Sequence, residues 1–267
     1  MNRIDERFQM LAKRGEKAFI PFITAGDPAL ARTEEIVLEL EKAGADIVEL
    51  GVPFSDPLAD GVVNQEAAQR ALKHNVSLRD ILGMVKRLRG STRVPIVLFT
   101  YYNPVLAYGE AKLAKDAREA GADGILCVDL PPEEGQALRQ AFADAGLSTV
   151  FLLAPTSTKE RIELIAKNST GFVYYVSRTG VTGERTSIES SVKGMVASIK
   201  QYTKLPVAVG FGISTPEQAR EVGAYADGVV VGSAIVRMIG ELGDSPSTAA
   251  KVGTFVKQLA DAAKGRG

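Results

Sequence analysis

Eight short apolar segments alternate with helix-like stretches along the whole chain, and this alternation restricts the possible folds more than any other feature of the sequence. Several segments, such as 96–99 and 229–231, are apolar at consecutive positions, which is typical of strands buried on both faces of a parallel sheet. The predicted strands are residues 18–24, 47–51, 95–100, 124–129, 149–154, 172–176, 206–210 and 228–232.

The stretches between these strands carry the start and stop signals of amphipathic helices. Ser77 stands where a helix N-cap is expected, and Thr215 precedes a proline at a first helical position. Several of the helices end in Ala-Gly or Val-Gly before the next strand, and glycine suits a left-handed helix cap. Additional helices are predicted at residues 3–14 and 63–75.

The repeated helix–Gly–strand unit of roughly thirty residues can build two architectures. It can close into a (β/α)8 barrel, or TIM barrel, or spread into an open doubly wound sheet. Eight units in a chain of 267 residues favour closure. We therefore predict one α/β domain over residues 1–267, a single (β/α)8 TIM barrel with extra N-terminal and loop helices.

Composition excludes several classes of function. The 32 basic and 32 acidic residues give a formal net charge of zero, which does not favour nucleic-acid binding. The apolar runs are too short to span a bilayer, and the N-terminal segment is charged rather than a signal peptide. Cys127, the single cysteine, cannot form an internal disulfide, which fits a reducing compartment. We expect a cytoplasmic protein, or one of the plastid stroma if the source is a plant and a transit peptide was removed.

A carboxylate, Glu49, interrupts the second predicted strand. Burial of a carboxylate is costly unless it has an ion-pair or hydrogen-bond partner or serves a function. The following loop is rich in Gly and Pro and carries Asp56 and Asp60. Glu49 and Asp60 are therefore a candidate general acid–base pair. Their structural alternatives are an ion pair for Glu49 and a turn cap for Asp60. Metal ligation by Asp56 and Asp60 is poorly supported because prolines and apolar residues separate them, and no metal is predicted.

Two glycine-rich segments follow the last two predicted strands, GFGIS at 210–214 and GSAIV at 232–236. Glycines let backbone N–H groups approach an anion, and a helix that begins near Ser233 would direct its positive end inward. Barrel enzymes frequently bind phosphate with these two loops, so we predict a phosphate monoester site, although tight turns would also explain the glycines. A dinucleotide is not expected because no glycine-rich fingerprint follows the first strand.

Further candidate substrate contacts lie where other predicted strands end. Phe22 belongs to the end of the first strand, Tyr102 and Asn103 follow the third, and Tyr174 lies in the sixth. Tyr102 would fit wall packing equally well. Residues 177–186 contain two glycines and are expected to close over the site.

Six motifs, found in order and nearly end to end, resemble the tryptophan synthase alpha chain family: PFITAGDP, ELGVPFSDPLADG, FTYYNP, SRTGVTGER, GFGIS and GSAIV. The resemblance implies a (β/α)8 barrel that cleaves indole-3-glycerol phosphate to indole and glyceraldehyde 3-phosphate. It also implies an α2β2 complex with a beta chain, which uses pyridoxal phosphate and receives the indole. No cofactor is implied for this chain itself.

Matching motifs imply roles for individual residues. Glu49 corresponds to the catalytic acid–base and Asp60 to the second catalytic acid. Tyr174 corresponds to the tyrosine that orients the substrate, and Thr182 to the loop threonine that closes toward Asp60. An apolar strand should favour a protonated Glu49, whereas a more polar loop should keep Asp60 ionised. The implied phosphate-binding positions are Gly183, Gly212, Gly232 and Ser233, and the implied partner-facing positions are Asp56, Pro57 and Asn103.

The chain departs from the family's usual pattern directly after Asp60-Gly61. The family usually has proline there and an apolar residue two places on, where this chain has Val62 and Asn64. Loss of the proline should loosen the loop backbone. Asn64 places a polar group where indole packing is expected.

Three alternative functions remain open on the sequence alone. The chain could be a related lyase that releases free indole without a partner. It could be another phosphate-binding barrel, such as a sugar-phosphate epimerase or isomerase. It could also be a non-catalytic activator of a partner that senses a phosphate ligand.

Overall fold

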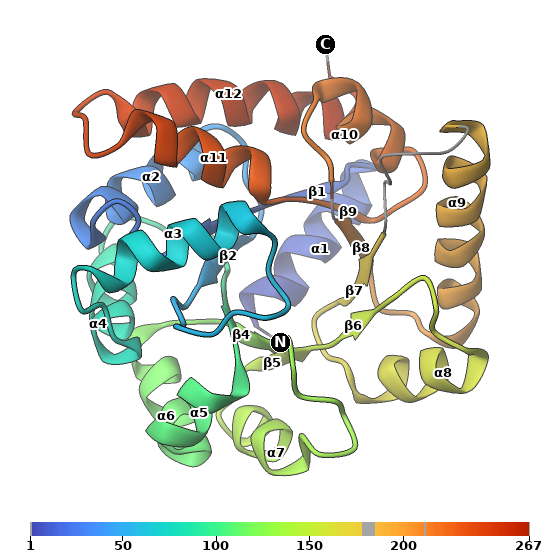
Figure 1. Ribbon diagram of the computed structural model, residues 1–267. Coiled ribbons are helices and arrows are strands. Elements are labelled where there is room, and N and C mark those ends of the chain that lie inside the picture. Colours follow the sequence, from blue (N-terminus) through green and yellow to red (C-terminus); the bar gives the residue numbers. More distant parts are fainter. Residues whose placement is uncertain (1, 178–184, 211, 267) are drawn as a thin grey trace.

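The computed structural model describes residues 2–177, 185–210 and 212–266, and it shows a barrel of parallel strands with helices around it (Figure 1). Neighbouring strands follow the order β5-β4-β3-β2-β1-β9-β8-β7-β6, and every described pair is parallel. The (β/α)8 prediction is therefore confirmed. The strands are β1 (Ala18–Thr24), β2 (Val48–Gly51), β3 (Ile96–Thr100), β4 (Gly124–Cys127), β5 (Ser148–Val150), β6 (Leu152–Leu153), β7 (Val173–Val176), β8 (Val207–Gly210) and β9 (Gly228–Val231).

The predicted continuous strand at 149–154 is wrong, because the structure divides it into β5 and β6 at Phe151. β5 pairs only with β4, and β6 pairs only with β7. Across the break, the backbone N–H of Tyr174 still donates to the carbonyl oxygen of Phe151 at 3.2 Å. Strands in a closed barrel are tilted and staggered, so one strand can meet its two neighbours with different halves. The two halves together occupy the fifth position of an eight-position barrel.

The helices begin and end largely where the sequence signals place them. Ser77 and Asp80 form a capping box at the start of α4, and Thr215 forms one with Gln218 at α10. Gly121 caps α6 in the left-handed conformation, with φ of 90°. The described helices are α1 (Arg3–Arg14), α2 (Leu30–Lys42), α3 (Val62–Leu72), α4 (Leu78–Leu88), α5 (Tyr102–Tyr108), α6 (Glu110–Ala120), α7 (Gln136–Asp144), α8 (Lys159–Asn168), α9 (Arg185–Tyr202), α10 (Pro216–Gly223), α11 (Ser233–Leu242) and α12 (Thr248–Ala263).

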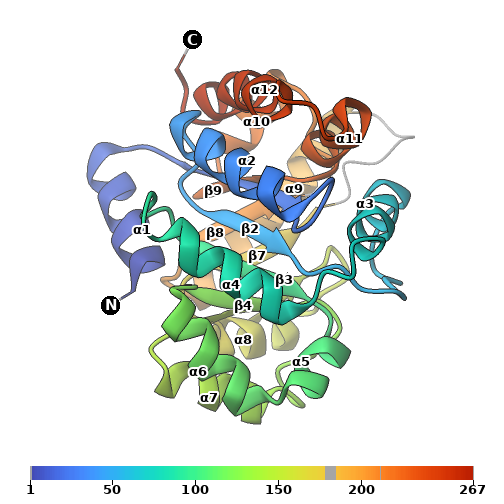
Figure 2. The same cartoon turned by 90° about the vertical axis from the view of Figure 1, so that its left-hand side faces the viewer.

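Helix α1 closes one end of the barrel. Its buried Ile4 and Phe8 belong to the same apolar cluster as the side chains inside the barrel, and the Phe8 ring packs against Phe172 with centroids 5.8 Å apart. In the perpendicular view, α1 lies on one side of the molecule, whereas α3 and α5 lie on the other (Figure 2). Any site inside the barrel must therefore open toward α3 and α5, at the carboxyl ends of the strands.

Three aspartates fix the strand register at the end of the barrel near α1. Asp123 and Asp227 stand directly before β4 and β9, and Asp46 stands two residues before β2. The carboxylate of each accepts a hydrogen bond from a backbone N–H of a neighbouring strand. The distances are 2.9 Å from Phe19 to Asp46, 2.9 Å from Ile96 to Asp123 and 3.0 Å from Val207 to Asp227. Basic side chains pair with all three carboxylates, namely Arg7 and Lys264 with Asp46, Arg3 and Arg89 with Asp123, and Lys200 with Asp227. These acids stabilise the barrel away from its open end.

Among the helices in the described part of the chain, none combines the length and apolar character that a membrane span requires.

Candidate functional site

Glu49 lies in the middle of β2, level with Phe22 of β1 and Val97 of β3. Its side chain is only 1% exposed, and its Oε1 has no hydrogen-bond partner among the residues that the structure describes. Burial raises its pKa to about 8, so the carboxyl group is mostly protonated at neutral pH. No salt bridge to Glu49 occurs in the described ranges, so the ion-pair interpretation is not supported there.

Tyr174 shares the barrel interior with Glu49. Burial raises the pKa of the Tyr174 hydroxyl well above its usual value, and the charge of Glu49 adds to this shift. Gly210 on β8 provides the space for the ring, because a Cβ atom built there would lie 2.4 Å from the Tyr174 hydroxyl oxygen. The adjacent Tyr175 packs in the outer core between strands and helices. Strand alternation therefore directs Tyr174, and not Tyr175, toward Glu49.

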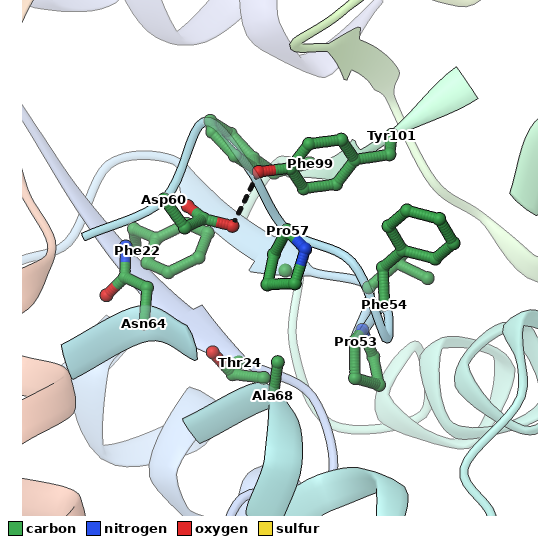
Figure 3. Close-up of a pocket in the computed structure, with 12 residues that line it drawn as sticks. Phe22, Thr24, Pro53, Phe54, Pro57, Asp60, Asn64, Ala68, Phe99 and Tyr101 are labelled. Atoms are coloured by element: carbon green, nitrogen blue, oxygen red, sulfur yellow. Dashed lines mark hydrogen bonds between the residues drawn. The ribbon is translucent and has the colours of Figure 1, made fainter. Parts of the chain in front are cut away.

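Asp60 lies on the loop between β2 and α3. Its Oδ2 accepts a hydrogen bond from the Tyr101 hydroxyl at 3.0 Å (Figure 3). The same hydroxyl accepts a bond from the backbone N–H of Ala59 at 3.0 Å, which ties the loop to the end of β3. Burial raises the pKa of Asp60, while the hydrogen bonds from Tyr101 and Asn64 lower it, and burial is the larger effect. The expected polar loop is thus present, but partial burial opposes ionisation.

A pocket is lined by Asp60 but not by Glu49, which lies level with the lining residue Phe22 on the neighbouring strand. The ring of Phe22 packs edge-on against Phe99, with centroids 5.0 Å apart. The ring of Phe54 lies 5.3 Å from that of Tyr101. Aromatic walls with a few polar groups are typical of sites for planar, mostly apolar ligands. The lining residues are Phe22, Thr24, Gly51, Val52, Pro53, Phe54, Pro57, Asp60, Asn64, Ala68, Phe99 and Tyr101 (Figure 3).

The two glycine segments predicted to bind phosphate follow adjacent strands. Gly212 follows β8 with φ of +77°, a conformation that favours glycine. Gly232 follows β9 and is the N-cap of α11, whose first residue is the exposed Ser233. Among the described residues no side chain caps this helix, so its N–H groups are available there to an anion. A Cβ atom on Gly232 would lie 3.4 Å from Phe22, so the helix begins directly beside the pocket.

Two adjacent tyrosines follow β3. The hydroxyl of Tyr102, the predicted substrate contact, donates to Glu110 at 3.0 Å, and Tyr102 does not line this pocket. Tyr101 lines it instead. The sequence carried a signal for this, because Phe99 and Tyr101 are two residues apart and therefore share a face of the extended chain. Thr182 and Gly183, both predicted binding residues, lie outside the described residues.

The predicted partner-facing residues lie around the open end of the barrel. Asp56 and Asn103 are exposed, whereas Pro57 lines the pocket. Large apolar side chains are exposed on the same loops and helices. They are Leu58, 92% exposed, Val62, 68% exposed, and Leu106, 59% exposed. Exposed apolar side chains that gather on one face are typical of an interaction surface.

In the described part of the chain, no group of three or more His, Cys, Asp or Glu residues could hold a metal ion. Cys127 is buried, and burial together with the nearby Asp129 raises the pKa of its thiol, so the described surroundings keep it protonated.

A parallel (β/α)8 barrel with a buried carboxyl group, an aromatic pocket and glycine loops after its last two strands has the architecture of the TIM-barrel enzymes, whose active sites lie at the carboxyl ends of the strands. The model of the family "Tryptophan synthase alpha chain" matches residues 8–264. The chain therefore belongs to the tryptophan synthase alpha chain family.

Individual relatives agree with this membership. The chain is 55% identical to the tryptophan synthase alpha chain of Geobacter sp. (strain M21) over 237 residues, 89% of each chain. It is 52% identical to that of Geobacter sulfurreducens over 262 residues, 98% of this chain and 99% of the relative. The crystal structure of tryptophan synthase subunit alpha from Legionella pneumophila superposes with a TM-score of 0.91 at 39% identity, covering 98% of each chain. A chain of tryptophan synthase from M. tuberculosis gives 0.88 at 32% identity, covering 99% of this chain and 100% of the other.

Proposed function

We propose that this chain catalyses the alpha reaction of tryptophan synthase, the carbon–carbon bond cleavage of indole-3-glycerol phosphate to indole and glyceraldehyde 3-phosphate. One observation carries the proposal: Glu49 is buried and unpaired at Oε1 within the described residues, has a pKa of about 8, and lies level with Phe22, which lines the aromatic pocket. A carboxyl group with such a pKa can give and take a proton near neutral pH.

The chemistry is a retro-aldol cleavage in which Glu49 moves two protons. The protonated carboxyl group donates a proton to C3 of the indole. The resulting carboxylate accepts the proton of the side-chain hydroxyl on the carbon attached to C3. The bond between C3 and that carbon then breaks, its electron pair returns to the indole ring, and the hydroxyl carbon becomes the aldehyde of glyceraldehyde 3-phosphate. Tyr174, buried next to Glu49, orients the substrate.

Asp60 assists at the other end of the indole ring. Its carboxylate accepts the indole N–H and stabilises the positive charge that develops when C3 is protonated. The indole ring packs against the rings of Phe22 and Phe99. Burial raises the pKa of Asp60, whereas the hydrogen bond from Tyr101 favours the ionised form that this role requires.

The phosphate group binds at the backbone N–H groups of the two glycine segments. Gly212, Gly232 and Ser233 lie after adjacent strands, with Ser233 at the start of α11, and Gly183 would add a fourth position. Holding the phosphate there fixes the reacting carbon relative to Glu49, which is a contribution from positioning. Thr182 would close toward Asp60 once the ligand is bound.

A beta chain is the proposed partner, in an α2β2 complex that passes indole directly onward. The exposed Leu58, Val62 and Leu106 support this, because they surround the open end of the barrel near Asp56 and Asn103. A partner there would cover the route by which indole leaves. Pro57, which lines the pocket, lies on the loop that would connect the pocket to the partner-facing surface. We place the protein in the cytoplasm.

The direct experiment is an assay for indole from indole-3-glycerol phosphate with the purified chain, with and without a beta chain. We expect slow cleavage alone and faster cleavage with the partner. Equal rates in both would favour a standalone lyase. Activation of the beta chain by phosphate ligands without any indole would favour a non-catalytic activator. Turnover of pentose phosphates without indole formation would identify a different phosphate-binding barrel.

A further inference from the structure

Asn64 is a partly buried polar residue of the pocket whose role the proposed reaction does not yet explain. It lies in the first turn of α3, where its backbone N–H donates to the Gly61 carbonyl at 3.0 Å. Its side chain lines the pocket and points toward Asp60 (Figure 3). The amide oxygen Oδ1 is buried and has no hydrogen-bond partner among the residues that the structure describes.

The chemistry of the two side chains fixes the orientation of this amide. The hydrogen bond from the Asn64 side chain lowers the pKa of Asp60, and an amide can donate only through its NH₂ group, so this group faces Asp60. That orientation leaves Oδ1 directed away, without a donor. A buried acceptor without a partner costs free energy that an apolar side chain at this position would avoid. The hydrogen bond that the NH₂ group donates to Asp60 therefore has to offset the cost of the unpaired Oδ1.

Asp60 is thus held from two sides. The Tyr101 hydroxyl, the titratable group in contact with it, donates to Oδ2 at 3.0 Å. The Gln65 side chain donates to the backbone carbonyl of Asp60 at 2.9 Å, which fixes the loop without touching the carboxylate. Two donors leave further lone pairs on the carboxylate for a ligand.

We propose that Asn64 is a positioning residue that holds the Asp60 carboxylate as an oriented, ionised acceptor for the ring N–H of an indole phosphate ligand. The inference rests on the proposed function for the identity of that ligand. Its part about Asp60 concerns the free protein and can be measured without turnover. Asn64 thus contributes less apolar packing to the pocket than an aliphatic residue would, and instead favours the ionised form of Asp60.

The first test follows the titration of Asp60 in the free chain by ¹³C NMR of its carboxyl carbon. Asn64→Leu keeps a similar volume and removes the donor, so the midpoint of Asp60 should rise by about one pH unit. Asn64→Asp places a second carboxyl group beside Asp60 and should raise one of the two midpoints further. Gln69→Leu is the matched control, an exposed amide on the same helix, and should leave the midpoint unchanged. An unchanged midpoint in both Asn64 variants would overturn the proposal.

The second test uses indole-3-propyl phosphate, which keeps the ring N–H and the phosphate, and its N-methyl analogue. At pH values below the titration midpoint of Asp60, Asn64→Leu should bind the N–H ligand about tenfold more weakly than the unsubstituted chain. At pH values above that midpoint, its affinity should recover. Affinity for the N-methyl ligand should be unaffected by the substitution at any pH. An equal loss for both ligands, independent of pH, would show a packing role and contradict the inference. Absence of cleavage by the unsubstituted chain with the NMR shift intact would count against the proposed function alone.

Discussion

The Tyr101 hydroxyl donates to Oδ2 of Asp60 at 3.0 Å and accepts from the Ala59 backbone N–H at 3.0 Å, so one side chain at the end of β3 fixes both the carboxylate and the loop that carries it. Hydrogen bonds to charged groups contribute about 1.5–3 kcal/mol. The position of Asp60 beside the pocket therefore depends on a residue from a different strand.

Replacement Tyr101→Phe should lower kcat/KM for indole formation by about tenfold or more, because it removes a donor that favours ionised Asp60. Tyr102→Phe is the matched control, since that hydroxyl bonds to Glu110 outside the pocket. Steady-state kinetics of the two variants provide the comparison. Similar losses in both would contradict the distinction between the neighbouring tyrosines.

The raised pKa of Glu49 predicts a pH-dependent stability. The folded chain retains a proton up to about pH 8 that the unfolded chain releases near its ordinary value of 4.5. The folded state therefore binds more protons between these values, and its stability falls as pH rises, by up to about 1.4 kcal/mol per pH unit from this group. Glu49→Gln should become increasingly more stable than the unsubstituted chain from pH 5 to about pH 8. Urea unfolding across this range measures the difference, and parallel stability profiles would contradict it.

The ion pair between the buried Asp27 and the partly exposed Arg70 predicts a large stability effect. Asp27 is 2% exposed, and Arg70 of α3 donates to both of its carboxylate oxygens at 2.8 Å. Arg70→Met should destabilise the chain by about 3–5 kcal/mol, because it leaves Asp27 buried without its partner. The double variant Asp27→Asn with Arg70→Met should recover part of that loss in urea unfolding. Additive losses would show that the two residues act independently.

Val62 occupies the first position of α3, where its N–H needs no intrahelical partner. Val62→Pro should therefore stabilise the chain by about 0.4–1 kcal/mol, mainly by restricting the unfolded chain. Thermal unfolding of the variant measures this gain. A lower melting temperature would show that the backbone at Val62 does not accept the φ angle of proline.

Much of the barrel could be predicted because its signals are local. The strand predicted at 18–24 matches β1 residue for residue, since an apolar run there is bounded by a lysine and a glycine turn. The start of α10 follows from Thr215 and Pro216 alone. The break at Phe151 could not be predicted, because it depends on which neighbours the two halves of that strand meet.

The site likewise combines features that the local sequence indicates with features that depend on contacts between distant segments. An acid in an apolar strand marked Glu49, but only the packed barrel shows how strongly burial raises its pKa. Tyr101 was missed although its two-residue spacing from Phe99 indicates that both side chains share a face of the extended chain. The structural aspartates Asp46, Asp123 and Asp227 were not recognised either, since each binds a backbone group at least twenty residues away in the sequence.

The most direct measurement is single-turnover cleavage of indole-3-glycerol phosphate by Glu49→Gln in the presence of a beta chain. The side chain keeps its size but can no longer exchange a proton, so indole release should fall by at least ~10²-fold, while affinity for the substrate analogue indole-3-propyl phosphate stays similar. Release at a rate close to that of the unsubstituted chain would contradict the assignment of Glu49 as the acid–base of the reaction.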